Sequence, residues 1–285
     1  MNGVDLGGLK REQVRQLRRI SAAQSASAEA ALLTAWASLA RFHDDLVLVG
    51  GLAVKYLIKP GGGLLPGAVT MDVDFGVTLA AEGGQYGTIA DDLAGQGFKR
   101  NEKGRYVRQF ETMDVFIDFL TEHSMATEGT AMVDGVPAGI FPGVARALAT
   151  RRKIIVEGKD LFGVVQKAVV PIAGIGALLV LKLNAFAGRQ QPKDAYDVLL
   201  GVSRYVDGAD KAIEAFHAEA RAGNQGYARA VETLKNYFFE AGQSAPLRCA
   251  AFALESQPAM DNLETRRSQI VEQLVTIGRA LAGEH

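Results

Sequence analysis

Cysteine and histidine are scarce in this chain. Its 285 residues include one cysteine, Cys249, and four histidines, at positions 43, 123, 217 and 285. A single cysteine excludes an internal disulfide framework and is compatible with a reducing compartment. Structural zinc sites take four cysteine or histidine ligands at short, regular spacings. With so few and such scattered ligands, the sequence argues against a structural zinc site.

The chain also lacks an excess of charge and a long apolar run. Its net charge is −1, so no overall basic character points to a nucleic-acid partner, although a local basic patch stays open. The most apolar stretch, residues 173–181, ends at Lys182 and Asn184 and is too short to cross a bilayer. The first residues, MNGVDLGGLKREQ, show no basic start followed by an apolar run, as a signal peptide would. We therefore expect a cytoplasmic protein with no membrane partner.

The sequence does contain alternating strand-like and helix-like segments. A helical region over residues 9–43 precedes a short strand at 46–49, a helix at 52–58 and a strand at 69–77. A strong strand follows at 113–120, with shorter strands before and after it. This order predicts an α/β (α+β) fold, with a mixed sheet flanked by helices.

Three parts are expected along the chain. The segment 1–45 reads as a helical region packed on the core, and residues 46–170 read as the α/β core itself. From about residue 174 the apolar spacing is helical throughout, which predicts a C-terminal helical domain over residues 171–285.

A glycine pair and an aspartate pair mark the first candidate site. Gly50 and Gly51 directly follow the strand 46–49, where glycine lets the backbone approach a ligand closely and offer N–H groups to an anion. Asp72 and Asp74 lie at i and i+2 on the next strand, so their side chains share a face about 6–7 Å apart. Carboxylate oxygens suit hard cations such as Mg²⁺ or Mn²⁺. The stretch predicts a site for metal-bound nucleotide phosphate, unless both aspartates face solvent on an edge strand.

A third carboxylate comes from the strand MDVFIDFL at 113–120. Its two aspartates, Asp114 and Asp118, share a face but lie about 13 Å apart, so they cannot ligate the same metal ions. Asp118 has the more apolar neighbours, where an unpaired carboxylate is costly and needs a partner. We therefore choose Asp118 over Asp114 as the third ligand. Three carboxylates on adjacent strands can hold two divalent ions about 3.5–4 Å apart.

A second group of charges lies in the helical half. Lys182 and Arg189 are seven residues apart and share one helix face, where they could receive the phosphates of a nucleoside triphosphate. Pro192 suits the first turn of the next helix. Asp194 then lies near that helix N-terminus, a favourable place for negative charge, and Asp197 follows one turn on. The alternative is an ordinary pair of helices pinned by salt bridges between these bases and acids.

The segments together resemble the AbiEii/AbiGii-type nucleotidyltransferases, a branch of the DNA polymerase β-like superfamily that includes toxins of bacterial toxin–antitoxin pairs. The resemblance runs from about residue 46 to 200 and rests on Gly50-Gly51, Thr70-x-Asp72-x-Asp74-Phe75, Ile117-Asp118-Phe119, VPIAGIGALLVLKLNAFAGR and KDAYDV. The last two look like the family's K-L-x-A-x-x-x-R and K-D-x-x-D blocks. One departure is Gly51, where much of the superfamily has serine, which leaves the backbone N–H to contact phosphate.

The resemblance implies a role for each residue of the two groups. Asp72 and Asp74 would carry Mg²⁺ or Mn²⁺, and Asp118 would be the third acidic residue or the base for the acceptor hydroxyl. Lys182 would contact the triphosphate of the NTP. The rest of the nucleotide pocket would comprise Gly50, Gly51, Arg189, Asp194 and Asp197.

The expected activity is transfer of a nucleoside monophosphate from an NTP to an acceptor. We expect an RNA end, such as that of tRNA, as the acceptor, and the resemblance implies a toxin that has a cognate antitoxin. Two alternatives stay open. The near-neutral charge leaves room for a protein hydroxyl or a small molecule as acceptor, because RNA binding normally requires a basic surface. A non-catalytic NTP-binding protein of the same fold is the other.

Overall fold

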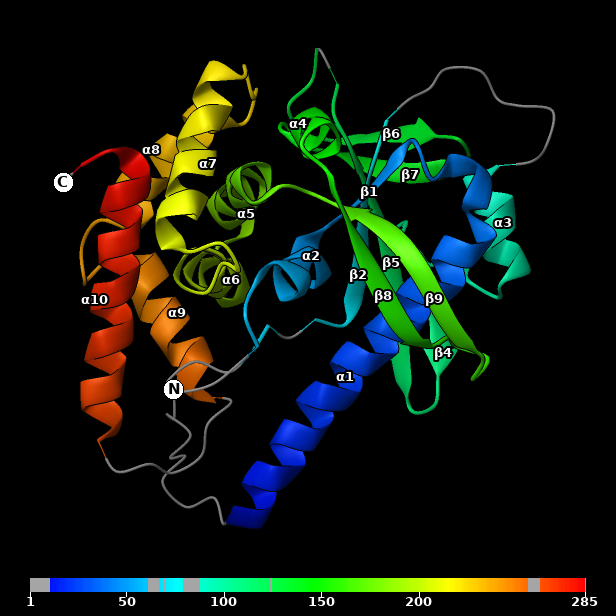
Figure 1. Ribbon diagram of the computed structural model, residues 1–285, viewed down its shortest axis with the longest axis horizontal. Coiled ribbons are helices and arrows are strands. Elements are labelled where there is room, and N and C mark those ends of the chain that lie inside the picture. Colours follow the sequence, from blue (N-terminus) through cyan, green and yellow to red (C-terminus); the bar gives the residue numbers. More distant parts are fainter. Residues whose placement is uncertain are drawn as a thin grey trace.

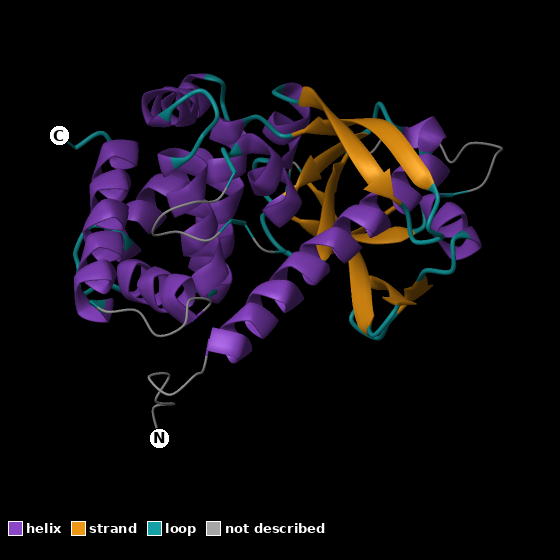
Figure 2. Cartoon of the chain, turned by 60° about the horizontal axis from the view of Figure 1, so that its bottom comes forward, coloured by secondary structure: helices purple, strands orange, loops and turns teal. Residues whose placement is uncertain are grey.

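The computed structural model describes residues 11–60, 67–68, 70–78, 88–123, 125–255 and 262–284, with the side chains of residues 11–24 outside the described part. The expected α/β class is confirmed, because the described residues form nine strands and ten α-helices. Figure 1 shows the strands gathered on one side of the molecule and helices α5 to α10 on the other. Figure 2 shows the same separation after a turn of the molecule.

All nine strands belong to one mixed sheet. They are β1 (Leu46–Val49), β2 (Asp72–Val77), β3 (Lys99–Arg100), β4 (Tyr106–Phe110), β5 (Met113–Thr121), β6 (Thr130–Val133), β7 (Val136–Ile140), β8 (Arg152–Lys159) and β9 (Val165–Ile172). Their order is β3-β4-β5-β2-β1-β9-β8, with β7 paired to the end of β5 and β6 paired to β7. The pairs β1–β9, β2–β5 and β5–β7 are parallel, and the others are antiparallel.

Strand β9 corrects the sequence analysis, which assigned no strand to residues 165–172. It lies inside the sheet, between β1 and the edge strand β8. Its sequence, VQKAVVPI, places Val165 and Val169 on exposed positions and includes a proline, so it shows no clean alternation of polar and apolar residues. Because β9 ends at Ile172 and the next helix begins at Ile175, the change from strands to helices falls just after residue 170.

Alternation along β2 decides which residues face the candidate site. Phe75 faces α1 (Arg11–Ser38), where its ring stacks on Trp36 at 6.1 Å between centroids. Gly76 faces the other side, under Val144 of α4 (Val144–Ala149). Since neighbours on a strand point to opposite faces, Asp72 and Asp74 share the side of Gly76, away from α1. Helix α1 thus covers one face of the sheet and leaves the carboxylates on the other.

The remaining helices comprise the second half of the molecule, α5 to α10, and three shorter helices. They are η2 (Ala40–Phe42), α2 (Gly50–Leu57), α3 (Ile89–Gly95), α5 (Ile175–Arg189), α6 (Pro192–Ser203), α7 (Ala209–Arg221), α8 (Tyr227–Tyr237), α9 (Ser244–Glu255) and α10 (Leu263–Ala282). Helix α5 is buried on nearly every side, as its apolar sequence predicts. Helix α2 follows β1 directly and contacts α5 and α6, so it joins the sheet to the helices. Among the described residues, no helix is long and apolar enough to cross a membrane.

Candidate functional site

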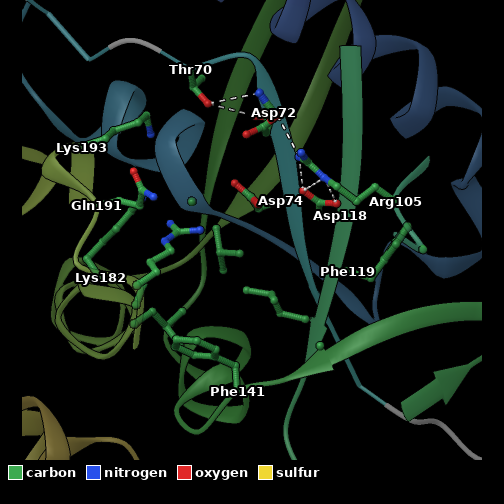
Figure 3. Close-up of a pocket in the computed structure, with 18 of the residues that line it drawn as sticks. Thr70, Asp72, Asp74, Arg105, Asp118, Phe119, Phe141, Lys182, Gln191 and Lys193 are labelled. Carbon is green, nitrogen blue, oxygen red and sulfur yellow. Dashed lines mark hydrogen bonds and ion pairs between the residues drawn. The ribbon is translucent and has the colours of Figure 1, made fainter. Parts of the chain in front are cut away.

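A cavity of about 590 Å³ lies between the sheet and helices α5 and α6. Its lining combines carboxylates and bases: Asp72, Asp74 and Asp118 from β2 and β5, and Lys103, Arg105, Lys182, Arg189 and Lys193 around them. Figure 3 shows the three aspartates on their strands with Arg105 beside them, facing Lys182, Gln191 and Lys193 across the cavity. The two groups of charges that were singled out separately in the sequence therefore meet in one place.

The register of β2 and β5 brings the three aspartates together. Asp74 lies directly opposite Asp118 in this parallel pair, and Asp72 lies two residues along, opposite Phe116. Neighbouring strands are about 4.8 Å apart, so the Asp74 and Asp118 side chains stand side by side. Asp114 lies at the far end of β5, exposed and opposite Gln109, and does not line the cavity. Of the two aspartates of β5, Asp118 is therefore the one at the cavity, and its role as third ligand stays a prediction.

Arg105 pairs with two of these carboxylates, and the sequence analysis did not single it out. Its Nε donates to Asp118 Oδ1 at 2.8 Å, and its Nη2 lies 2.5 Å from Asp118 Oδ2 and 2.9 Å from Asp72 Oδ1. Hydrogen bonding to Asp118 raises the pKa of Arg105 above its usual value, so the guanidinium stays charged. No periodic pattern marks this residue, because it lies in the turn before β4 and meets Asp118 only through the β4–β5 pairing.

Asp74 carries negative charge that the surrounding cations do not fully neutralise. Burial and the nearby charges of Asp118 and Asp72 together raise the pKa of its carboxyl to about 6. Lys182 and Lys193 act in the opposite direction without restoring the ordinary pKa value. A carboxylate in this setting is stabilised by one more positive charge. The electrostatics around Asp74 therefore fit a bound cation.

The carboxylates of Asp72, Asp74 and Asp118 offer the ligand type that a divalent metal ion prefers, but their present arrangement does not form a metal site. Oxygen ligands are those that Mg²⁺ and Mn²⁺ prefer. Within the described residues, no group of three or more acidic, histidine or cysteine side chains is close enough to hold a metal ion as it stands. Arg105 lies between Asp72 and Asp118, in the space that a shared ion would need. The metal role of Asp72, Asp74 and Asp118 stays a prediction.

The glycine pair serves close packing as well as ligand access. Gly50 opens α2 with φ +68° and lines the cavity, and a Cβ atom there would lie 1.8 Å from Asp74 Oδ2. Gly51 lies just outside the lining, and a Cβ atom at this position would meet Lys193 Nζ at 2.6 Å and Thr70 at 2.9 Å. Both positions exclude a side chain because functional-site residues occupy the space. Of the two, only Gly50 is placed to contact a ligand.

Asp194 and Asp197 stand behind the cavity and hold its bases. Lys182 Nζ lies 2.6 Å from Asp197 Oδ2 and 3.5 Å from Asp194 Oδ1, and Arg189 binds Asp194 through two hydrogen bonds of 2.7 and 2.8 Å. Both aspartates are fully buried and absent from the lining. As expected, α6 begins at Pro192 with Asp194 in its first turn. The salt bridges expected for an ordinary pair of helices are present. They also fix the positions of Lys182 and Arg189, which line the cavity.

Lys193 is a further cavity residue that the sequence analysis quoted without giving it a role. Its Nζ lies 3.1 Å from Asp197 Oδ2 and reaches the lining near Gly51. Burial alone would raise the pKa of Asp197, but the charges of Lys182 and Lys193 lower it below its usual value. The i,i+4 spacing of Lys193 and Asp197 was the sequence signal that could have identified this pair.

Comparison with known proteins gives no match to this chain, either among protein-family models or among curated sequences.

Proposed function

We propose that this protein is a nucleotidyltransferase that transfers a nucleoside monophosphate from an NTP to an acceptor hydroxyl and releases pyrophosphate. One observation carries the proposal. Three aspartates on two neighbouring strands face three basic side chains of α5 and α6 across a single cavity. The carboxylates suit metal-bound phosphate, and Lys182, Arg189 and Lys193 suit the phosphates themselves.

The residues divide the reaction between them. The acceptor oxygen attacks the α-phosphorus, the bond to the bridging oxygen of the β-phosphate breaks, and pyrophosphate leaves. The basic side chains of α5 and α6 bind and orient the β- and γ-phosphates and offset the charge on the leaving group. Asp118 is the candidate to take the hydroxyl proton once Arg105 no longer pairs with it, because its carboxylate lines the cavity beside Asp74. A divalent ion held by Asp72, Asp74 and Asp118 would neutralise phosphate oxygens when bound.

We further propose an RNA end, such as that of tRNA, as the acceptor, and a toxin role with a cognate antitoxin. The resemblance to AbiEii/AbiGii-type enzymes supports this assignment, as does the positive charge of Lys103 on the sheet side of the cavity. Backbone phosphates of an RNA would meet this charge. A cytoplasmic location is consistent with such an acceptor.

Labelling of RNA tests the proposal directly. The protein is incubated with α-³²P-labelled NTPs, Mg²⁺ and total RNA, and labelled RNA is separated on a gel. Asp74→Asn should lower labelling by about a thousandfold, because a lost metal ligand removes several kcal/mol of transition-state stabilisation. Asp114→Asn, on the same sheet but outside the cavity, should label as the wild type does. Labelling that survives both Asp72→Ala and Asp74→Ala would show that the mechanism is wrong.

A non-catalytic NTP-binding protein is the second candidate, and the Arg105 bridge favours it. An arginine already paired with Asp72 and Asp118 offsets one of their two negative charges without a metal ion. Saturable binding of Mg²⁺·NTP with no label in RNA, polypeptide or small molecules would support this candidate. Label in polypeptide or in a small molecule, with none in RNA, would instead keep the chemistry and change the acceptor.

A further inference from the structure

We propose that Arg105 is a built-in counter-ion of the carboxylate cluster, and that a divalent cation must displace it to bind there. The proposal rests on the proposed function, because it concerns the control of cation binding at that same site. It predicts that the nucleotide-free protein binds divalent cations weakly, and that the Arg105 side chain causes this low affinity.

The position of the Arg105 guanidinium prevents a divalent metal ion from binding at the same place. Nη2 contacts Asp72 Oδ1 at 2.9 Å and Asp118 Oδ2 at 2.5 Å, so it already lies between the two carboxylates. A magnesium ion bound by both would need oxygens at about 2.0–2.1 Å from the same central point. Two positive groups cannot share that space. Metal binding through Asp72 and Asp118 therefore requires Arg105 to leave.

The surroundings of Arg105 hold the arginine in place. The side chain of Asn101 accepts hydrogen bonds from the backbone N–H groups of Lys103 and Arg105, both at 3.0 Å, and so shapes the turn that carries the arginine. The guanidinium carbon lies 4.3 Å from the centre of the Phe116 ring, within cation–π range. Backbone, ring and carboxylates thus select one position for the group.

The same surroundings leave the arginine a way out. Its side chain is 33% exposed, and it is carried by a turn rather than by the interior of the sheet. The guanidinium can move toward solvent without crossing the core. Once displaced, it stays tethered to the cavity, where the phosphates of an incoming NTP carry the opposite charge. Cation and NTP should therefore bind more tightly together than either does alone.

Binding of Mn²⁺ in the absence of nucleotide tests the proposal. Free Mn²⁺ is measured by electron paramagnetic resonance with wild type, Arg105→Met and Arg108→Met. Methionine keeps an apolar side chain over Phe116 and removes the competing charge. We expect Arg105→Met to bind Mn²⁺ about tenfold more tightly than wild type. Arg108→Met is the matched control, because Arg108 contacts the Gln96 carbonyl and the Phe162 ring instead of a carboxylate, and its Mn²⁺ affinity should stay that of wild type.

Two further variants separate displacement from a general change in charge or folding. Arg105→Lys keeps the charge but loses the two-pronged contact with Asp118, so its affinity should lie between those of wild type and Arg105→Met. Adding Asp74→Asn to Arg105→Met should abolish the gain. Thermal unfolding gives a second readout, since Mn²⁺ should raise the Tm of Arg105→Met more than that of wild type.

The outcomes distinguish this inference from the proposed function. Equal Mn²⁺ affinity in wild type and Arg105→Met would overturn the counter-ion role, while RNA labelling by the wild type would still uphold nucleotidyl transfer. Tighter Mn²⁺ binding by Arg105→Met in a protein that labels no acceptor would support the counter-ion role and overturn transfer. An equal gain in Arg108→Met would also overturn the inference, because it would reduce the effect to overall charge.

Discussion

At the scale of single residues, the site depends on glycine backbone that packs directly against charged side chains. Gly50 brings the start of α2 against the Asp74 carboxylate, and Gly51 leaves room for Lys193. Behind the cavity, buried Asp194 and Asp197 fix the ends of long basic side chains that would otherwise be mobile. The cavity lining is thus held by residues that do not themselves line it.

Gly50→Ala tests the close approach at α2. A residue other than glycine is strained at φ +68°, and the new methyl group would displace the Asp74 carboxylate. We expect nucleotidyl transfer to fall by about a hundredfold, the effect of misplacing a catalytic group by about 1 Å. Gly188→Ala on α5 is the control, because no atom lies within 4 Å of its added Cβ and its φ is not positive. Normal transfer by Gly50→Ala would show that Asp74 tolerates the shift.

At the scale of secondary structure, the elements differ in how far sequence predicts them. Strand β2 was predictable because Asp72 and Asp74 alternate with buried Val73 and Phe75. The pattern of β9 was not, since its outer valines are exposed. The alternation of residues along the strands also predicted that Asp72 and Asp74 share one face of the sheet. Arg105 could not be predicted, because its contact with Asp118 depends on how β4 pairs with β5.

Asp197→Asn tests the buried ion pairs that join α5 to α6. The substitution leaves Lys182 charged and buried with Asp194 as its remaining acidic partner at 3.5 Å. Breaking one side of a buried pair costs about 3–5 kcal/mol of the free energy of unfolding, which urea titration at pH 7 would measure. Glu214→Gln, which removes the exposed pair with Lys211, should change little. A loss no larger than that of Glu214→Gln would contradict the role given to Asp197.

At acid pH, wild type and Asp197→Asn should have the same free energy of unfolding. The folded-state pKa of Asp197 is lowered, chiefly by Lys182 against the opposing effect of burial. Its stabilisation is therefore fully present above the unfolded pKa of about 3.9 and is lost as the pH falls through the lower folded value. Urea unfolding at a series of pH values should show the two free energies converging only below about pH 4. Convergence near neutral pH would contradict the lowered pKa.

At the scale of the whole molecule, one continuous core joins the sheet to the helices. The buried apolar side chains of β1, β2 and β5 belong to the same cluster as those of α5 and α6. Helix α2 bridges the two halves, with contacts to β1, β2, α5 and α6. The cavity lies at this junction, so its carboxylates come from the sheet half and three of its bases, Lys182, Arg189 and Lys193, from the helical half. A ligand that binds both groups should stabilise the two halves together.

Thermal unfolding with a non-hydrolysable NTP and Mg²⁺ tests this coupling. A ligand present at 100 times its Kd adds about 2.7 kcal/mol to the free energy of unfolding. Because the core is continuous, calorimetry should show a single transition that moves as a whole to a Tm about 5 °C higher for a chain of this size. Lys182→Met, which removes a base from the helical side, should reduce the shift, whereas Lys211→Met, at an exposed position of α7, should keep it. Two transitions, of which the ligand moves only one, would mean that the halves unfold separately and that the ligand binds one of them alone.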